Sequence, residues 1–373
     1  MAIKSVLVTG GAGFIGSHVV DLLLEKGYKV RILDKLVDQV HENKTNKYIP
    51  EKAELIVGDI CDKKIVEEAL KDMDAVINLA AEVGVGQSMY EITRYMNTNT
   101  GGTAVMLELL ASGKYDIKRM VVASSMSVYG EGMYQCQDDG IISPPLRSES
   151  QLKNRIWEVL CPKCQKVLKP IPTTEDKPLD PASIYAISKL DQELMTLSVG
   201  RAYDISSIAL RFFNTYGTRQ SLSNPYTGVA AIFSSRLLNN ETPLVFEDGE
   251  QARDFVHVSD VAAAVVMALE KVEVKDVVCN IGSGQPVTVN EVAIKLAKKL
   301  GVNIEPNIMH NYRVGDIRHC WADTSRTKEL LGFEAKISFD EGLDDLIEWV
   351  KDEPAIDRGA QAQSELNTRG LTL

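Results

Sequence analysis

The sequence contains no apolar run that approaches the roughly 20 residues needed to cross a bilayer. Its first apolar run ends at Thr9 and Gly10, too early for the core of a signal peptide. We therefore expect a cytoplasmic protein without a membrane partner. Six cysteines are spread over 373 residues, and Cys161 and Cys164 have a spacing that suggests metal or redox chemistry rather than a structural disulfide.

Positive charge is also in deficit, with 41 Lys and Arg against 52 Asp and Glu and a formal net charge of -11. This field repels nucleic acid, which we exclude as a partner. An anionic ligand must instead be held by locally placed arginines or backbone N–H groups. The length and the 45% hydrophobic content allow a large core, which favours one large α/β domain with a smaller lobe.

Short apolar strands alternate with segments of helical periodicity over the first half of the chain. The strands are predicted at residues 5–9, 29–33, 54–57, 74–78 and 119–123, and the helices at 15–26, 62–71, 90–112 and 183–203. Alternation of this kind predicts a doubly wound parallel sheet, a Rossmann fold, covered by helices on both faces.

This pattern divides the chain into three parts. Residues 1–214 are expected to form the Rossmann domain, with an inserted excursion at 131–180 that is rich in Pro, Cys and Gly and a last strand contributed by 277–280. Residues 215–350 would form the smaller α/β lobe that binds the substrate. The polar, weakly patterned residues 351–373 are expected to be a frayed or disordered tail.

A glycine-rich turn between the first strand and the first helix indicates a dinucleotide site. Gly10, Gly13 and Gly16 allow the backbone to approach a pyrophosphate, and Asp34 ends the second strand, where an acid binds the ribose hydroxyls and favours NAD over NADP. Arg31 and Lys35 leave that preference open, and a ligand-free tight turn is the alternative. The predicted NAD ligands are Gly10, Gly13, Phe14, Ile15, Gly16, Asp34, Asp59, Ile60, Ala80, Ala81, Asn99, Tyr185 and Lys189.

Three residues are candidates for the chemistry. Tyr185 and Lys189 are one helical turn apart on the same face, and a nearby ammonium favours the tyrosine phenolate, which can then act as a base. Ser125, after the fifth strand, can hydrogen-bond the same substrate oxygen. The alternative is a half-exposed aromatic beside a solvated lysine.

Taken together, these segments resemble the extended short-chain dehydrogenase/reductases that epimerise, dehydrate or reduce nucleotide sugars. The resemblance runs from residue 5 to about 350. It rests on the motifs TGGAGFIG (9–16), NLAA (78–81), NTGGT (99–103), SSMSVYG (124–130), YAISK (185–189), RFFN (211–214), RDFVH (253–257) and RVGD (313–316).

This resemblance implies roles for further residues and a quaternary structure. Asn99 is similar to the family's structural asparagine. A homodimer is implied, with helices 90–112 and 183–203 of each copy in a four-helix bundle. The implied substrate ligands are Gln87, Ser88, Met126, Asn214, Asn224, Phe246, Arg253, Arg313 and Asp316, of which the two arginines also suit a diphosphate.

The residues after Ser125 bear on the reaction. Dehydratases of this family carry an Asp-Glu pair there, whereas this chain has Met126 and Ser127, so a 4-epimerase that passes through a 4-keto sugar is favoured. The chain is most similar to the UDP-glucose and dTDP-L-rhamnose 4-epimerase groups, and nucleotide and sugar stay open. A ketoreductase or dehydrogenase, a dehydratase and a non-catalytic NAD-sensing scaffold remain alternatives.

The insert has cysteines of its own. Similar family members carry two Cys-x-x-Cys pairs here, which implies a zinc-ribbon-like lobe. This chain keeps Cys161 and Cys164, but Cys136 is followed by Asp139 where a second cysteine would stand. Three thiolates and a carboxylate can still bind a structural zinc, and the alternative is a degenerate site of buried cysteines. The remaining three, Cys61, Cys279 and Cys320, are expected in the core.

Overall fold

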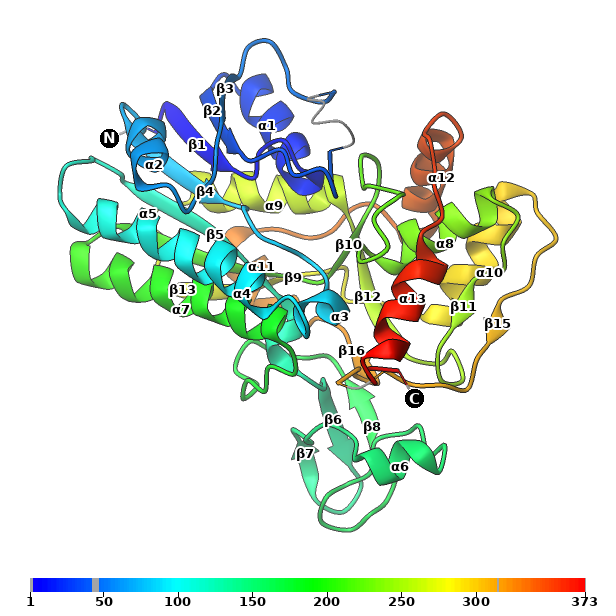
Figure 1. Cartoon of the computed structure of the whole chain (residues 1–373). Helices are drawn as coiled ribbons and strands as arrows, with labels where there is room; N and C mark the ends of the chain where they lie inside the picture. The colour runs from blue at the N-terminus through cyan, green and yellow to red at the C-terminus, as the bar shows by residue number, and fades with distance from the viewer. Residues whose placement is uncertain (1–2, 42–46, 314, 373) are drawn as a thin grey trace.

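A seven-stranded parallel sheet forms the centre of the protein (Figure 1). The computed structural model describes residues 3–41, 47–313 and 315–372, so that Val314, inside the RVGD motif, lies outside the described residues. The strand order is β13-β9-β5-β4-β1-β2-β3, and it reverses between β1 and β4, where the carboxyl ends of strands form a ligand crevice. The strands are β1 (Ser5–Thr9), β2 (Lys29–Asp34), β3 (Glu54–Val57), β4 (Ala75–Asn78), β5 (Arg119–Ser125), β9 (Ser206–Phe212) and β13 (Val277–Ile281). The predicted doubly wound fold is confirmed.

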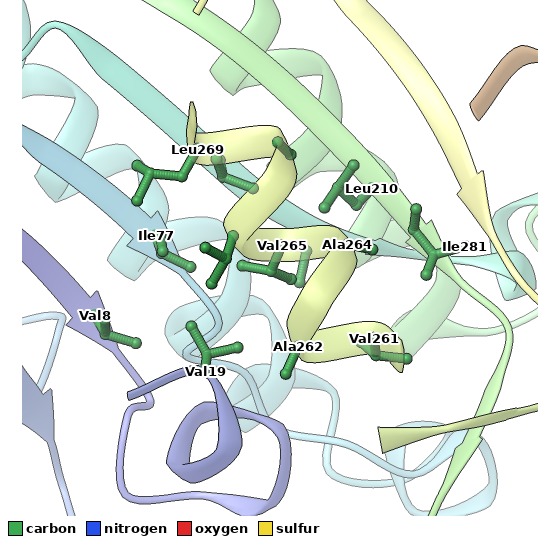
Figure 2. Close-up of a cluster of buried hydrophobic side chains, with 14 of the residues drawn as sticks. Val8, Val19, Ile77, Leu210, Val261, Ala262, Ala264, Val265, Leu269 and Ile281 are labelled. Atoms are coloured by element: carbon green, nitrogen blue, oxygen red, sulfur yellow. The ribbon is translucent and has the colours of Figure 1, made fainter. Parts of the chain in front are cut away.

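Helices cover both faces of this sheet. On one face, α1 (Phe14–Glu25) packs against α9 (Val258–Glu270); on the other lie α2 (Lys63–Leu70), α5 (Gly102–Ala111) and α7 (Ile184–Tyr203). Figure 2 shows Val261, Val265 and Leu269 of α9 directed toward strand residues such as Ile77 and Leu210. These side chains are fully buried, so the hydrophobic effect fixes α9 on the sheet.

The helix predicted over 90–112 is interrupted. The chain forms α3 (Val85–Ser88), α4 (Ile92–Tyr95) and a π-helical segment (Met96–Gly101) before α5 begins. Asparagine, threonine and glycine fill the π segment, and they favour regular helix poorly. The backbone also passes close to the side chain of Ile60, in the loop after β3, because a Cβ on Gly102 would lie 2.4 Å from its Cγ2.

The smaller lobe has its own hydrophobic core. Helices α8 (Val229–Leu238), α10 (Val289–Leu300) and α12 (Phe339–Val350) enclose buried Phe233, Val292 and Leu346. The strands of this part are β10 (Asn214–Tyr216), β11 (Leu244–Val245), β12 (Ala252–His257), β14 (Pro286–Thr288), β15 (Asn307–Ile308) and β16 (His319–Cys320), and α11 (Ser325–Leu331) returns to pack on α9 and β13.

The insert projects from the rest of the molecule as a separate small sheet (Figure 1). It contains β6 (Met133–Cys136), β7 (Gly140–Ile142), β8 (Lys169–Ile171) and α6 (Glu149–Lys153), and the antiparallel strand order is β7-β6-β8. Tyr134, Val159 and Leu168 form its small core.

Two further expectations are wrong. The supposedly frayed tail forms α13 (Gly359–Thr368), because Ala362 and Leu366 are one turn apart and both become buried against the rest of the protein. Cys61 is exposed rather than in the core. None of the described helices combines the length and the apolar character needed to cross a membrane.

Candidate active site

One cavity of about 680 Å³ runs between the sheet and the smaller lobe. The glycine loop after β1 lines one end, Ser125 and Tyr185 line the middle, and Arg253 and Arg313 of the smaller lobe line the other end. The cavity begins at the strand ends where the sheet order reverses, the usual place for a ligand in such a fold. An elongated ligand with a dinucleotide part and a second anionic part fits this arrangement.

The glycine loop forms a cradle that only glycine can build. A Cβ on Gly16 would lie 2.1 Å from the carbonyl oxygen of Gly10, and Gly10 itself has a φ of +69°. Gly13 caps α1 without a side-chain hydrogen bond, so the first N–H groups of the helix can bind an anion. The adjoining Phe14 and Ile15 line the cavity as well. These residues fit the pyrophosphate of a dinucleotide.

Asp34 lies at the end of β2 beside this cradle. Its carboxylate accepts hydrogen bonds from the backbone N–H groups of Ala12 at 3.0 Å and Leu36 at 2.9 Å. Lys35 is held by Asp59 at 2.7 Å. Because the acid lines the cavity and the nearby lysine is neutralised, the pocket favours ribose hydroxyls over a 2′-phosphate. Ile60, Ala80 and Ala81 also line this end.

The three residues predicted to do the chemistry meet in the middle of the cavity. The Ser125 hydroxyl oxygen accepts hydrogen bonds from the backbone N–H of Ser127 at 3.2 Å and from its hydroxyl at 2.9 Å. The proton of Ser125 is therefore free to point toward Tyr185 or a substrate oxygen. Ser183 caps α7 through a 3.1 Å bond from the Ala186 N–H, which fixes the turn that carries Tyr185.

The electrostatics of this group differ from the prediction. Burial raises the pKa of Tyr185, and the hydrogen bond with Ser125 opposes this only in part. Burial also lowers the pKa of Lys189 to about 7, although Glu193 acts in the opposite direction. The Lys189 ammonium donates to Gln192 Oε1 at 2.6 Å.

Two arginines, Arg253 and Arg313, form an arginine clamp at the far end of the cavity. Arg313 donates to Asp316 at 2.8 Å and lies over the ring of Phe246, 4.8 Å from its centroid. Arg253 donates to the other Asp316 oxygen at 3.3 Å and to the Ile317 carbonyl at 2.7 Å. Burial alone would raise the pKa of Asp316, but the two arginines outweigh it and hold the pKa at about 2. The acid therefore stays ionised and orients both guanidinium groups.

Comparison with known proteins decides the family. A model described as the NAD dependent epimerase/dehydratase family matches residues 6–151, and one described as GDP-mannose 4,6 dehydratase matches 167–346. The dTDP-L-rhamnose 4-epimerase of Burkholderia thailandensis is 34% identical, over 94% of this chain and 96% of that protein. The chain belongs to the NAD-dependent epimerase/dehydratase family.

Solved structures of this epimerase/dehydratase family superpose on nearly the whole chain. The UDP-glucose 4-epimerase of Thermotoga maritima with UDP-glucose has a TM-score of 0.77 at 33% identity, covering 93% of this chain and 99% of that one. The Thermus thermophilus UDP-glucose 4-epimerase in complex with NAD has a TM-score of 0.75 at 27% identity, with 94% and 100% covered.

Three predicted ligands of this family member lie behind the cavity wall. Asn99 is fully buried and bonds both backbone groups of Glu82 and the Ser188 hydroxyl, so it holds the loop after β4. Ser88 accepts a 3.0 Å bond from the Tyr185 N–H and so supports the start of α7. Gln87 bonds Gln39, Glu91 and Tyr95 instead of facing the cavity. Met126, Asn214 and Asn224 do line it.

Several cavity residues were not predicted from the sequence. Glycine and small residues at 84–86, which carry no chemical signal alone, form the wall beside α3. The tail was also missed, because its polar sequence suggested disorder. The unpredicted residues include Gly84, Val85, Gly86, Ser127, Tyr226, Gly359, Ala362, Gln363, Leu366 and Leu371.

A buried charge network connects the insert with the segments that carry the arginine clamp. Arg147 of the insert donates two 2.8 Å hydrogen bonds to Glu247, and Arg318 donates to the same carboxylate at 3.1 Å. Glu247 follows Phe246, and the backbone N–H of Arg318 is held by buried Glu131 at 2.8 Å. The insert is thereby fixed to the segments that carry the arginine clamp.

The cysteine cluster of the insert is brought together by β6 and the 161–164 turn. The ligand atoms of Cys136, Asp139, Cys161 and Cys164 all lie within 4.8 Å of one another. Cys136 Sγ is 3.5 Å from Cys164 Sγ, and Cys161 Sγ is 3.2 Å from Asp139 Oδ2. Separations of this size fit four ligands around one tetrahedral ion with bonds of about 2.0–2.3 Å.

Proposed function

We propose that this protein is an NAD-dependent nucleotide-sugar 4-epimerase. The main support for this proposal is the position of Ser125, Tyr185 and Lys189 midway along one cavity, between the glycine cradle and the arginine clamp. That position is where the reacting carbon of a sugar would lie if NAD occupied one end and the nucleotide diphosphate the other. The relatives named as 4-epimerases support the same reaction.

The two ends of the cavity would hold the two ligands. The cradle at Gly10–Gly16 with Asp34 would bind NAD, which supplies a hydride acceptor and donor when bound. Arg253 and Arg313 would bind the diphosphate of the substrate, and Phe246 offers a ring face for the nucleobase. Because these anchors are far from the sugar carbons, a sugar oxidised at carbon 4 can turn while the nucleotide stays bound.

Tyr185 would take the proton from the sugar 4-hydroxyl and return it after the sugar has turned. Ser125 donates its free hydroxyl proton toward the same oxygen and keeps it aligned. Burial disfavours a charged Tyr185, so the nearby Lys189 ammonium is needed to favour the phenolate. Met126 and Ser127 follow Ser125, and neither provides the carboxyl group that water elimination needs.

The test is to incubate the purified protein with UDP-, dTDP-, GDP- and CDP-sugars without added cofactor and to resolve products by chromatography and proton NMR. We expect a carbon-4 epimer without net NAD consumption, and none from a Tyr185→Phe variant. A stable keto or reduced sugar formed with stoichiometric cofactor turnover would instead identify a dehydrogenase or reductase.

We further propose a cytoplasmic homodimer. All six cysteines are unpaired, which suits a reducing compartment. Ile187 and Leu194 are exposed on α7 two turns apart, and Ile92 of α4 is 48% exposed. A second copy that packs its own α4, α5 and α7 there would cover these side chains. Sedimentation of the wild type against a Leu194→Glu variant tests this, since the variant should be monomeric.

We also propose that the insert binds one structural zinc through Cys136, Asp139, Cys161 and Cys164. The ion would tie the 161–164 turn to β6 in a lobe whose hydrophobic core is small. The site would be closed by four protein ligands and lies outside the catalytic cavity, so its role would be to stabilise the insert.

A further inference from the structure

The C-terminal segment, residues 355–372, forms part of the cavity wall. In Figure 1, α13 runs between α3 on one side and β11 and β15 on the other. The second family match ends at residue 346, so this segment lies beyond the part of the chain that matches the family models.

Contacts on both sides hold the segment in place. Toward the smaller lobe, Asp357 pairs with Arg236 at 2.9 Å, and the Ile356 N–H donates to Ser223 at 3.2 Å. At α13, Glu365 accepts hydrogen bonds from the hydroxyl groups of Tyr90 at 2.8 Å and Tyr226 at 2.7 Å.

Further contacts extend to the end of the segment. Arg369 lies over the ring of Tyr90, 4.1 Å from its centroid. Thr372 forms a β-bridge with Arg313 of the arginine clamp. The segment is thus connected to both lobes.

The inner face of α13 lies close to the catalytic residues. Leu366 is 8% exposed, and a Cβ on Gly86 would be 3.2 Å from its Cδ2. Gly86 belongs to α3, whose last residue, Ser88, bonds the backbone N–H of Tyr185. One short helix therefore separates Leu366 from the turn that carries Tyr185, and both residues line the same cavity.

The charges around this wall disfavour an acidic sugar. The segment presents Ala362, Gln363, Leu366 and Leu371 to the cavity. The carboxylate of Glu365, on the same helix, contacts the hydroxyl groups of Tyr90 and Tyr226. Four of the lysines and arginines in the described cavity lining pair with carboxylates: Lys35 with Asp59, Arg236 with Asp357, and Arg253 and Arg313 with Asp316. In the proposed function Arg253 and Arg313 are also used by the diphosphate, and Lys189, which donates to the neutral amide of Gln192, is used by Tyr185. A sugar carboxylate would be buried there without a free cation, which is unfavourable.

We propose that the C-terminal segment determines sugar specificity by selecting a neutral sugar and rejecting a uronic acid, with Leu366 as the deciding contact. This inference rests on the proposed nucleotide-sugar function and adds the class of sugar. The apolar face of α13 packs on the sugar ring, and the tyrosine-bound Glu365 adds a carboxylate to the same helix.

The experiment compares the binding of UDP-glucose and UDP-glucuronate to the NAD-loaded, full-length protein by calorimetry. The wild type should bind UDP-glucose at least about tenfold more tightly than UDP-glucuronate. Leu366→Arg adds a cation to the wall and should reverse or remove this preference. Ser364→Arg adds the same charge on the exposed side of α13 and should leave it unchanged.

Glu365→Gln provides a second test that preserves shape, because it keeps both tyrosine contacts and removes the charge. It should improve UDP-glucuronate binding selectively. If the ratio of the affinities for UDP-glucose and UDP-glucuronate were the same in the wild type and all three variants, the role of the C-terminal segment in sugar specificity would be overturned. Epimerase activity in the sugar panel would still support the proposed function. Failure of the wild type to bind the neutral sugar of any nucleotide in the panel would count against both proposals.

Discussion

The ammonium of Lys189 lies 2.6 Å from the side-chain carbonyl oxygen of Gln192, and both residues are buried. The amide of Gln192 is fixed in this orientation, because its Nε2 donates to Thr103 Oγ1 at 2.8 Å. Thr103 also accepts from Asn78, whose Oδ1 accepts from Thr9 at the start of the glycine loop. The lysine is thus positioned by a chain of neutral groups that reaches the dinucleotide cradle.

This arrangement predicts the effect of changing Gln192. Burial places the pKa of Lys189 at about 7, so its ammonium is lost as the pH rises through neutrality. If the ammonium supports Tyr185, kcat/KM should fall in the same range. Gln192→Glu puts a carboxylate beside the ammonium of Lys189. The pH at which kcat/KM decreases should then be higher by about 1 to 3 units. The measurement is a pH profile of epimerisation with saturating NAD.

A Gln192→Met variant is the matched control for this prediction. It removes the hydrogen-bond acceptor of Lys189 without adding charge, so the pKa of Lys189 should decrease. The decrease in kcat/KM should then occur at lower pH. Profiles that superpose in all three proteins would show that Gln192 does not act on the lysine.

Lys189 should lower stability while it supports activity. Its pKa is about 7 when folded and 10.5 in its ordinary range, so between these values the unfolded chain binds a proton that the folded chain does not. Stability contributed by this residue therefore rises with pH over that window, and the full penalty applies below pH 7. Lys189→Met should be inactive but more stable at pH 6, and its advantage should shrink by roughly 1 kcal/mol per pH unit above 7.

Denaturant unfolding of both proteins at pH 6, 8 and 9 measures this difference. Lys63→Met serves as the control, because Lys63 is exposed and pairs with exposed Glu108. If the difference in unfolding free energy between Lys189→Met and the wild type were the same at every pH, it would contradict a lowered pKa for buried Lys189.

The zinc proposal predicts one ion per chain after expression in medium that contains zinc. Asp139→Cys replaces the hard oxygen ligand with a thiolate and should slow zinc loss to a chromogenic chelator, whereas Cys161→Ser should abolish retention. Cys61→Ser is the control, since that thiol is exposed and outside the cluster. Elemental analysis that finds no zinc in the wild type would leave the cluster as an unmetallated thiol group.

The parts predicted from sequence share a local origin. Gly10, Gly13 and Gly16 lie within one turn, and Tyr185 and Lys189 are one helical turn apart, so spacing alone indicated their geometry. Strand and helix periodicity likewise predicted the doubly wound fold that the structure confirms. Each of these features is encoded by residues that are neighbours along the chain.

The missed features depend on contacts between distant residues. Arg147 and Glu247 are 100 positions apart, and Tyr90 and Glu365 are 275 apart. Neither pair carries a periodic or motif signal, and a polar tail with few apolar residues gives no local reason to fold. The tail becomes helical because tertiary contacts outweigh its weak propensity.

Of the contacts between the insert and the segments that carry the arginine clamp, the buried ion pair of Arg147 and Glu247 should affect stability most when it is substituted. Both side chains are about 1% exposed, so Arg147→Met would leave the Glu247 carboxylate without one of its two partners in the interior. Breaking a buried pair on one side destabilises proteins by about 3–5 kcal/mol. Arg318 still contacts Glu247, which places the expected loss at the lower end of that range.

Urea unfolding of Arg147→Met should therefore show a lower midpoint, and KM for the nucleotide sugar should increase because Phe246 precedes Glu247. Lys153→Met is the matched control: Lys153 and Glu149 also form an ion pair in the insert, but both are 61% exposed, so solvent screens their attraction. A double variant, Arg147→Met with Glu247→Leu, should recover part of the stability, because it removes the carboxylate of Glu247 but leaves buried Glu131 without its contact to Arg147. If the double variant were less stable than Arg147→Met, the loss would reflect packing rather than an unpaired buried carboxylate.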